Sequence, residues 1–372
     1  MRRGYAFCSL YGLVGANLRG VSNHPAVKGR GAPTNPAGRF ERLAFVQEPE
    51  DEPDVTRPAR PTELFRDTSK SILAFNDSPD VPMDASVNPY RGCEHGCIYC
   101  YARPYHEYLG LSAGADFESK IFVKENAAAL LREALSAKSW TPQVIGLSGV
   151  TDPYQPVERK LRITRACLEV LEQCRNPVAV ITKNHLVTRD IDLLTSLAQH
   201  QAAQVFLSVT TLDDDLARMM EPRASRPALR LEAMRKLREA GVPVGVMVAP
   251  IIPALTDHEV PAILEAAAEA GATMADCTVV RLPHGVKELF EQWLDAHAPL
   301  RKGKVLNRLR DMRDGKLNDS KFGSRMVGQG PFAESIQRVF DLHRRKLGLT
   351  QKLSLSTQAF RRPGGSQLGL FG

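Results

Sequence analysis

From about residue 84 the sequence alternates between short apolar, β-branched runs and amphipathic helical stretches, and this alternation restricts the fold more than any other feature. Apolar runs of this length are typical of parallel strands that are buried on both faces. The predicted strands are Ser86–Tyr90, Gln143–Gly149, Pro177–Thr182, Gln204–Thr210, Val242–Pro250 and Cys277–Leu282. The predicted helices are Leu161–Gln173, Ile191–His200, Leu229–Ala240, Glu259–Ala270 and Val286–His297. This series of six βα units predicts an α/β barrel or a doubly wound sheet, which periodicity does not distinguish.

Two regions of different composition flank this α/β domain, which we expect at residues 81–298. Residues 1–80 contain many prolines and an acidic run, Glu48–Asp54. We therefore expect an extended, partly disordered leader, or a belt wrapped over the domain, without a core of its own. Residues 299–372 are expected to form a basic helical C-terminal segment and a tail.

The net charge of +7 is concentrated in the C-terminal segment. Between Leu300 and Leu353 there are fourteen Lys and Arg side chains and five Asp and Glu side chains, so this segment has a net charge of +9. Such a segment is either a solvated basic surface or a site for a phosphate-rich partner. Nucleic acid is therefore a candidate partner.

The cysteine content indicates the compartment. Seven cysteines, three of them within eight residues, fit metal ligation in a reducing cytosol better than a disulfide framework. The apolar stretch Tyr5–Ala16 is interrupted by serine and glycine, unlike the core of a secretory signal. The longest apolar runs, such as Val242–Ile252, are too short to span a membrane. We therefore expect a cytoplasmic protein without a membrane partner.

Three cysteines with the spacing C-x₃-C-x₂-C, namely Cys93, Cys97 and Cys100, follow the first predicted strand. Soft thiolates select iron–sulfur clusters, zinc or copper(I). A closed zinc site needs four ligands, and His95 is the nearest candidate for the fourth, although it lies inside the loop between two thiolates. Three thiolates on a four-iron cluster leave one iron open, as catalytic metal sites do. Zinc, an electron-transfer cluster and cysteines without a ligand role are the alternatives.

The sequence around these cysteines, NPYRGCEHGCIYCYAR at Asn88–Arg103, resembles the signature of the radical S-adenosylmethionine superfamily, in its spore-photoproduct-lyase-like branch. Further motifs of that branch follow in the expected order: TDPYQPVE at Thr151–Glu158, TK at Thr182–Lys183, SVTT at Ser208–Thr211, EPR at Glu221–Arg223 and PIIP at Pro250–Pro253. The resemblance extends from about Ser69 to Arg345. It implies a partial (βα)₆ TIM-type barrel rather than a doubly wound sheet.

The resemblance also implies cofactors and an activity. Cys93, Cys97 and Cys100 would hold three irons of a [4Fe–4S] cluster, and the open iron would bind the amino and carboxylate groups of S-adenosylmethionine. An electron donor of the flavodoxin or ferredoxin type would drive reductive cleavage, and the resulting 5′-deoxyadenosyl radical would abstract hydrogen from an unidentified substrate. The alternative is a non-enzymatic iron–sulfur or zinc protein that binds nucleic acid.

Four residues near the loop and the second strand are expected to contact S-adenosylmethionine, by their positions in these motifs. Tyr99 resembles the aromatic residue that packs near the adenine, with ordinary barrel packing as the alternative. Gly149 permits close backbone approach, and Thr151 or Asp152 would accept from the cofactor ammonium. The acidic residue of the family lies nearer the glycine, so Asp152 is also a candidate for stabilising the turn before Pro153.

Three residues at later strand ends complete the expected cofactor contacts. Ser208 resembles a ribose-binding position, and Lys183 is either a carboxylate or substrate contact or a rim ion pair. Arg223 is placed to pair with the cofactor carboxylate. No catalytic residue is assigned for the substrate. The hydrogen-donor cysteine of spore photoproduct lyases has no counterpart in Ser148–Tyr154, so their repair reaction is not implied.

Overall fold

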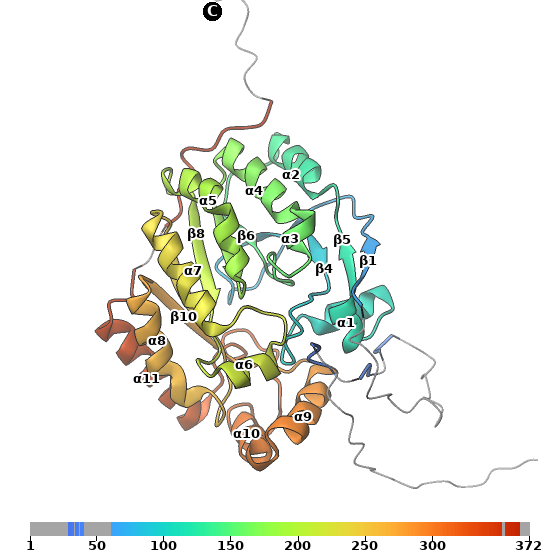
Figure 1. Cartoon of the computed structure of the whole chain (residues 1–372), viewed down its shortest axis with the longest axis vertical. Coiled ribbons are helices and arrows are strands. Elements are labelled where there is room, and N and C mark those ends of the chain that lie inside the picture. Colours follow the sequence, from blue (N-terminus) through green and yellow to red (C-terminus); the bar gives the residue numbers. More distant parts are fainter. Residues whose placement is uncertain (1–28, 33, 37, 41–60, 352–353, 365–372) are drawn as a thin grey trace, which may run out of the picture.

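The structure is a computed structural model that describes residues 29–32, 34–36, 38–40, 61–351 and 354–364 (Figure 1). In this part of the chain the main sheet has seven strands, in the order β10-β9-β8-β7-β6-β3-β2. All neighbouring pairs from β3 to β10 are parallel, and β2 is antiparallel at the edge. These parallel strands follow chain order, so each right-handed crossover advances in the same direction and places its helices on one face. A doubly wound sheet would reverse at a switch point, and the sheet is therefore the wall of a partial barrel.

Except for β2, which was not predicted, the strands of the wall overlap the predicted runs. They are β2 (Leu73–Phe75), β3 (Ala85–Val87), β6 (Ile145–Leu147), β7 (Val178–Thr182), β8 (Ala203–Ser208), β9 (Val244–Ile251) and β10 (Met274–Val279). The prediction for the last strand was wrong in register, because β10 begins three residues before Cys277 and ends before Leu282. Met274 pairs with Gly245 of β9. Pairing with β9 sets this start, since the first residues of β10 are not β-branched.

Helices cover the outer face of the wall, where Figure 1 shows α4, α5, α7 and α8 along the strands. They are α2 (Ala127–Ser136), α4 (Ile163–Cys174), α5 (Ile191–Ala198), α7 (Pro227–Glu239) and α8 (Val260–Glu269). The described chain also contains the helices α3 (Glu158–Leu161), α6 (Asp214–Met220) and α9 (Val286–His297) and the 3₁₀ helices η2 (His185–Asp190) and η3 (Asp257–Glu259). The single helix predicted at Leu161–Gln173 is divided, because Arg162 has a left-handed φ of +54° between α3 and α4. Gly241 follows α7 with a φ of +81°, the left-handed conformation in which glycine often ends a helix.

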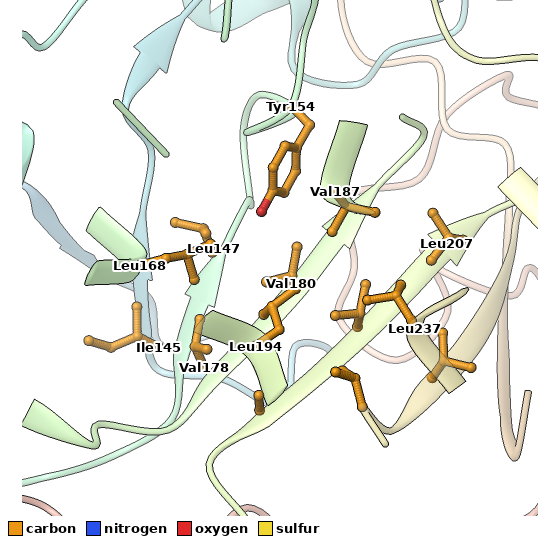
Figure 2. Packing of buried hydrophobic residues seen from close by; sticks show 14 of the residues in the cluster. Ile145, Leu147, Tyr154, Leu168, Val178, Val180, Val187, Leu194, Leu207 and Leu237 are labelled. Atoms are coloured by element: carbon orange, nitrogen blue, oxygen red, sulfur yellow. The ribbon is translucent and has the colours of Figure 1, made fainter. Parts of the chain in front are cut away.

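The main core lies between the sheet and these helices (Figure 2). Val178 and Val180 of β7 and Leu207 of β8 are fully buried in one cluster with Leu194 of α5 and Leu237 of α7. Each such side chain contributes roughly 1.5–3 kcal/mol when it leaves water. The wall is thus a rigid support for the residues at its strand ends.

A second sheet flanks the barrel next to the cysteine loop, in the order β1-β5-β4. Its strands are β1 (Glu63–Arg66), β4 (Tyr90–Arg91) and β5 (Lys120–Val123), and α1 (Ala115–Ser119) precedes β5. Both β1 and β2 lie within the predicted leader. A further part of that leader contacts the domain, since Asn35 bonds to Asp116 (3.1 Å) and Arg39 pairs with Glu107. Residues 1–28, 33, 37 and 41–60 of the predicted leader lie outside the described ranges.

The basic C-terminal segment packs on the barrel through α10 (Pro299–Asp311) and α11 (Gly330–Lys346). Val305, Leu306 and Leu309 form the buried face of α10, which lies beside α9 (Figure 1). Phe340 of α11 joins the main core. No helix within the described residues has the length and apolar character needed to cross a membrane.

Candidate functional site

The three cysteines of the C-x₃-C-x₂-C motif lie on one loop between β4 and the 3₁₀ helix η1 (Arg103–Leu109). Cys93 and Cys97 are buried, and Cys100 is half-buried. Gly96 has a φ of +68°, and a Cβ on it would lie 2.9 Å from Glu118 Oε2. Glycine therefore satisfies both a left-handed backbone and a close approach within the loop.

The protein environment favours the protonated form of two of these thiols, Cys97 and Cys100. Burial, and next to it the charge of Glu221, raises the pKa of Cys97 well above its usual value. Burial, followed by the neighbouring Cys93, raises the pKa of Cys100 to about 11. A thiolate ligand must lose its proton, so a bound metal group would have to supply the compensating positive charge.

The spacing of possible ligands also bears on the kind of metal group. In the described residues, no three His, Cys, Asp or Glu side chains form a site for a single metal ion. A single zinc ion needs all its ligands within about 2.0–2.3 Å of one centre. A four-iron cluster instead takes one thiolate at each iron, so its thiolates need not converge on one point. Whether the three thiols hold such a cluster stays a prediction.

A fully buried ion pair supports the cysteine loop. Arg103 and Glu118 are both 0% exposed and are hydrogen-bonded to each other. Arg103 also donates to the carbonyls of Cys97 (3.0 Å) and Gly96 (3.2 Å), inside the loop. Glu118 accepts from the amides of residues 31–32 at 2.8 Å each. The pair therefore joins the loop to the described part of the leader.

Arg223 contacts the loop in this structure. Its Nη1 lies 3.0 Å from Glu94 Oε1 and 3.2 Å from Thr62 Oγ1. Glu94 is buried, and its Oε2 has no hydrogen-bond partner among the residues described. The Arg223 side chain remains 31% exposed, so its guanidinium has donors left for a further carboxylate. The predicted contact with the cofactor carboxylate stays a prediction.

Asp152 lies against His95, the histidine between the first two cysteines. Asp152 Oδ2 accepts from the Lys183 amide (2.7 Å) and lies 3.4 Å from His95 Nδ1, while its Oδ1 accepts from Thr182 Oγ1 (2.7 Å). His95 Nε2 lies 3.1 Å from Asn184 Nδ2. Burial opposes a charge on His95, but the charges of Asp152 and then Cys93 raise its pKa to about 10, which favours an imidazolium paired with Asp152. Asp152 thus connects two strand ends to the loop, and its role toward the cofactor ammonium remains untested.

Tyr99 belongs to a buried charged network. Its hydroxyl donates to Glu221, which also pairs with Arg230 and lies 3.4 Å from Lys183 Nζ. Although burial opposes ionisation, Arg230 and then Lys183 hold the pKa of Glu221 well below its usual range. Burial and the Glu221 charge raise the pKa of Tyr99. Lys183 therefore forms the predicted alternative, an ion pair, and its Nζ lies 5.8 Å from the centre of the Tyr99 ring.

The remaining predicted cofactor residues also lie at strand ends or just beyond them. Gly149 follows β6 with a φ of +135°, a backbone region that favours glycine, and its carbonyl accepts from the Tyr101 hydroxyl. Thr151 is buried and donates to the Tyr90 carbonyl (3.1 Å). Ser208 is buried at the last position of β8. The barrel thus brings the predicted residues to one end of the wall, next to the cysteine loop.

Several residues of this site were missed by sequence reasoning. Arg103 and Glu221 stood inside the quoted motifs without an assigned role, whereas Glu118 and Arg230 lay in none of them. Both missed partners are charged residues within helices, and both are almost fully buried. A charge that is not exposed requires a partner, but the sequence does not reveal which helical charges are buried.

A comparison with family models identifies the class of this fold and loop. Residues 87–267 match the model of the Radical SAM superfamily. The matched region runs from the end of β3 into α8 and contains the three cysteines. The part of the chain between residues 87 and 267 therefore has the sequence features of a radical SAM domain.

Individual relatives are similar over part of the chain. Uncharacterized proteins of Mycobacterium bovis and Mycobacterium tuberculosis are 36% identical over 226 residues, which cover 59% of this chain and 66% of each relative. This chain therefore matches just under two thirds of their length. The Radical SAM Nalpha-GlyT isomerase of Pseudomonas phage M6 is 26% identical over 175 residues, 46% of this chain and 34% of that protein. A mutant of spore photoproduct lyase is similar in fold, with a TM-score of 0.55 at 16% identity over 79% of this chain and 82% of that chain.

Proposed function

We propose that this protein is a radical enzyme that binds a [4Fe–4S] cluster through Cys93, Cys97 and Cys100 and cleaves S-adenosylmethionine reductively. The observation that carries the proposal is the single loop that presents three thiols beside the strand ends of a partial barrel. When bound, the cluster and S-adenosylmethionine would supply a 5′-deoxyadenosyl radical that abstracts hydrogen from a substrate. A flavodoxin- or ferredoxin-type donor would provide the electron.

The protein residues have positioning roles in this proposal. The Arg103–Glu118 pair holds the carbonyls of the loop in place, and its complete burial keeps water from competing for them. The exposed donors of Arg223 are available for the cofactor carboxylate. Ser208 at the end of β8 and Tyr99 beside Lys183 are the proposed ribose and adenine neighbours.

The environment of His95 favours iron over zinc in this loop. A Cys₃His zinc site would need one ring nitrogen of His95 as its fourth ligand. Both ring nitrogens of His95 instead contact protein partners. Nδ1 of His95 lies near the Asp152 carboxylate, and Nε2 of His95 lies near the Asn184 side-chain amide. His95 therefore contacts Asp152 and Asn184 through its ring nitrogens and leaves neither nitrogen free as a ligand.

The first experiment measures metal content. After anaerobic purification and reconstitution, the protein should contain about four iron and four sulfide per chain. Replacing Cys93, Cys97 or Cys100 by Ala should remove the iron and the brown chromophore. Cys174→Ala is the matched control, because Cys174 is buried on α4 outside the loop. Stoichiometric zinc in place of iron would contradict the proposal and support the zinc alternative.

The second experiment measures cleavage. The reduced, reconstituted protein should release 5′-deoxyadenosine from S-adenosylmethionine, slowly when no substrate is present. A protein that holds a full cluster but neither binds nor cleaves S-adenosylmethionine would instead be the non-enzymatic iron–sulfur protein. Deuterium transfer from cell-extract components into 5′-deoxyadenosine would then identify the substrate.

We further propose nucleic acid as a partner, because α10 contributes a basic stripe to a groove against α11. Arg301, Lys304 and Arg308 lie on one face of α10 and line this groove together with His258 and Phe332. Spacings of three and four residues place them on the same side of the helix. Arg313 also belongs to the basic C-terminal segment, but it is buried and does not belong to this surface.

A salt titration tests this partner. Binding of single-stranded DNA or RNA at the α10 groove should weaken with salt, with a log–log slope of about 0.7 per phosphate contacted. Changing both Arg301 and Arg308 to Glu should abolish this binding, whereas Arg235→Glu on the exposed surface of α7 should not. Salt-insensitive binding, or equal effects of both changes, would leave the groove as a solvated surface.

A further inference from the structure

Two arginines meet beyond the C-terminal end of β10, the last strand of the barrel wall. Arg281 follows this strand, and Arg313 follows α10. Arg313 is 3% exposed and donates through Nη2 to the carbonyl of Val280 (2.7 Å), the residue next to Arg281. Active-site groups of barrel enzymes lie at this end of the strands.

Neither guanidinium has a carboxylate partner in the part of the chain that the structure describes. Nε and Nη1 of Arg313, and Nε of Arg281, are buried nitrogens without a hydrogen-bond acceptor among these residues. Arg281 Nη1 faces the sulfur of Met326 at 3.6 Å, and a thioether is a weak acceptor. The two arginines therefore have several donors left for a ligand.

The neighbouring carboxylates are already engaged. Asp80 is paired with Arg325 and also accepts from the Gly323 amide (2.7 Å). Asp319 accepts from Ser324 and from the Lys321 amide (2.9 Å). Asp80 thus bonds to the segment between α10 and α11, and Asp319 bonds within that segment.

The two positive charges oppose each other. Burial, and next to it the charge of Arg281, lowers the pKa of Arg313 to about 10. Burial, followed by Arg325, lowers the pKa of Arg281. Buried like charges without counter-ions are unfavourable, and an anion placed between them would relieve this.

The pair lies beside the cysteine loop. The Arg281 guanidinium is 5.7 Å from the centre of the Tyr101 ring, and Tyr101 directly follows Cys100. The Tyr101 hydroxyl donates to the Gly149 carbonyl at the end of β6. An anion at the arginines would therefore lie across the barrel mouth from β6, next to the proposed cluster.

We infer that Arg281 and Arg313 bind an oxyanion of the substrate, a phosphate or a carboxylate group, and hold the substrate at the barrel mouth. This inference rests on the proposed radical function, because it assigns the substrate end of the same site. The planar fork of a guanidinium suits two oxygens of one anion, and two such groups hold it in a defined orientation.

Anion-dependent stabilisation of the reconstituted full-length protein tests this site. Inorganic phosphate and acetate are titrated separately, with chloride at equal ionic strength as the reference. A saturable rise in melting temperature is expected for at least one of them. Arg281→Gln should weaken the apparent affinity about tenfold or more, and Arg281→Lys should retain part of it. Arg235→Gln, on the exposed surface of α7, should leave it unchanged.

The arms of the experiment separate the outcomes. Saturation by phosphate or by acetate identifies the anion, and loss of saturation in Arg281→Gln but not in Arg235→Gln supports the site. No saturation by either anion, or unchanged affinity in Arg281→Gln, overturns it. Weaker binding of S-adenosylmethionine in Arg281→Gln would assign the pair to the cofactor and overturn the substrate role. If the wild-type protein binds the anion through Arg281 but forms no 5′-deoxyadenosine, the proposed function fails and the anion site stands.

Discussion

Replacing Arg103 by Met tests whether the buried ion pair organises the cysteine loop. The change keeps most of the apolar stem of the side chain and removes its charge. Glu118, at 0% exposure, would lose its counter-ion, and the carbonyls of Gly96 and Cys97 would lose a donor. Breaking a buried pair in this way costs about 3–5 kcal/mol. We therefore expect the free energy of unfolding to fall by that amount, a change of at least about a hundredfold in the unfolding equilibrium.

Urea unfolding of the metal-free protein, followed by circular dichroism, measures this loss, and iron content after reconstitution reports on the loop. Arg66→Met is the matched control. Arg66 and Glu125 are 76% and 66% exposed with 3.7 Å between their charged atoms, so this change should cost less than about 1 kcal/mol. The double change of Arg103→Met and Glu118→Gln should lose less than the sum of its parts, because it leaves no buried charge. Equal losses for Arg103→Met and Arg66→Met, with full iron content in both, would refute the role of the pair.

Three further predictions concern buried or site residues. Burial lowers the pKa of His106 to about 4 from its usual 6.5, so the unfolded chain binds more protons between these values. The free energy of unfolding should therefore fall by about 3 kcal/mol as the pH drops from 6.5 to 4. Urea unfolding of His106→Gln over the same pH range should lack this contribution. Glu221→Gln leaves the buried Arg230 unpaired, so the free energy of unfolding, measured in urea, should fall by about 3–5 kcal/mol. An unchanged urea midpoint would contradict this prediction. Asp152→Asn and Arg223→Gln should weaken binding of S-adenosylmethionine more than they reduce iron content. Wild-type affinity in both variants would remove these residues from the cofactor site.

The order of elements and the cysteine loop could be predicted from the sequence, because both depend on local patterns. Apolar β-branched runs form buried strands wherever they occur, and the spacing of three thiols is set within eight residues. The start of β10 was missed because the prediction used local patterns alone. Residues such as Met274 join the strand through their pairing with β9, and no local pattern encodes that pairing.

The partners of buried charges depended on the tertiary structure. In the sequence, Arg313 and Arg308 belong to the same basic C-terminal segment. In the fold Arg313 is buried, whereas Arg308 lines the groove between α10 and α11. Glu118 and Arg230 likewise receive their roles from residues distant in the chain, since an ion pair forms only where folding brings opposite charges together and excludes water. The sequence by itself determined most strands and helices of the barrel wall and the thiol loop, because these follow from local periodicity and spacing. The tertiary structure alone decided which charges are buried and which remain free for a ligand, because burial depends on all the segments that pack around a side chain.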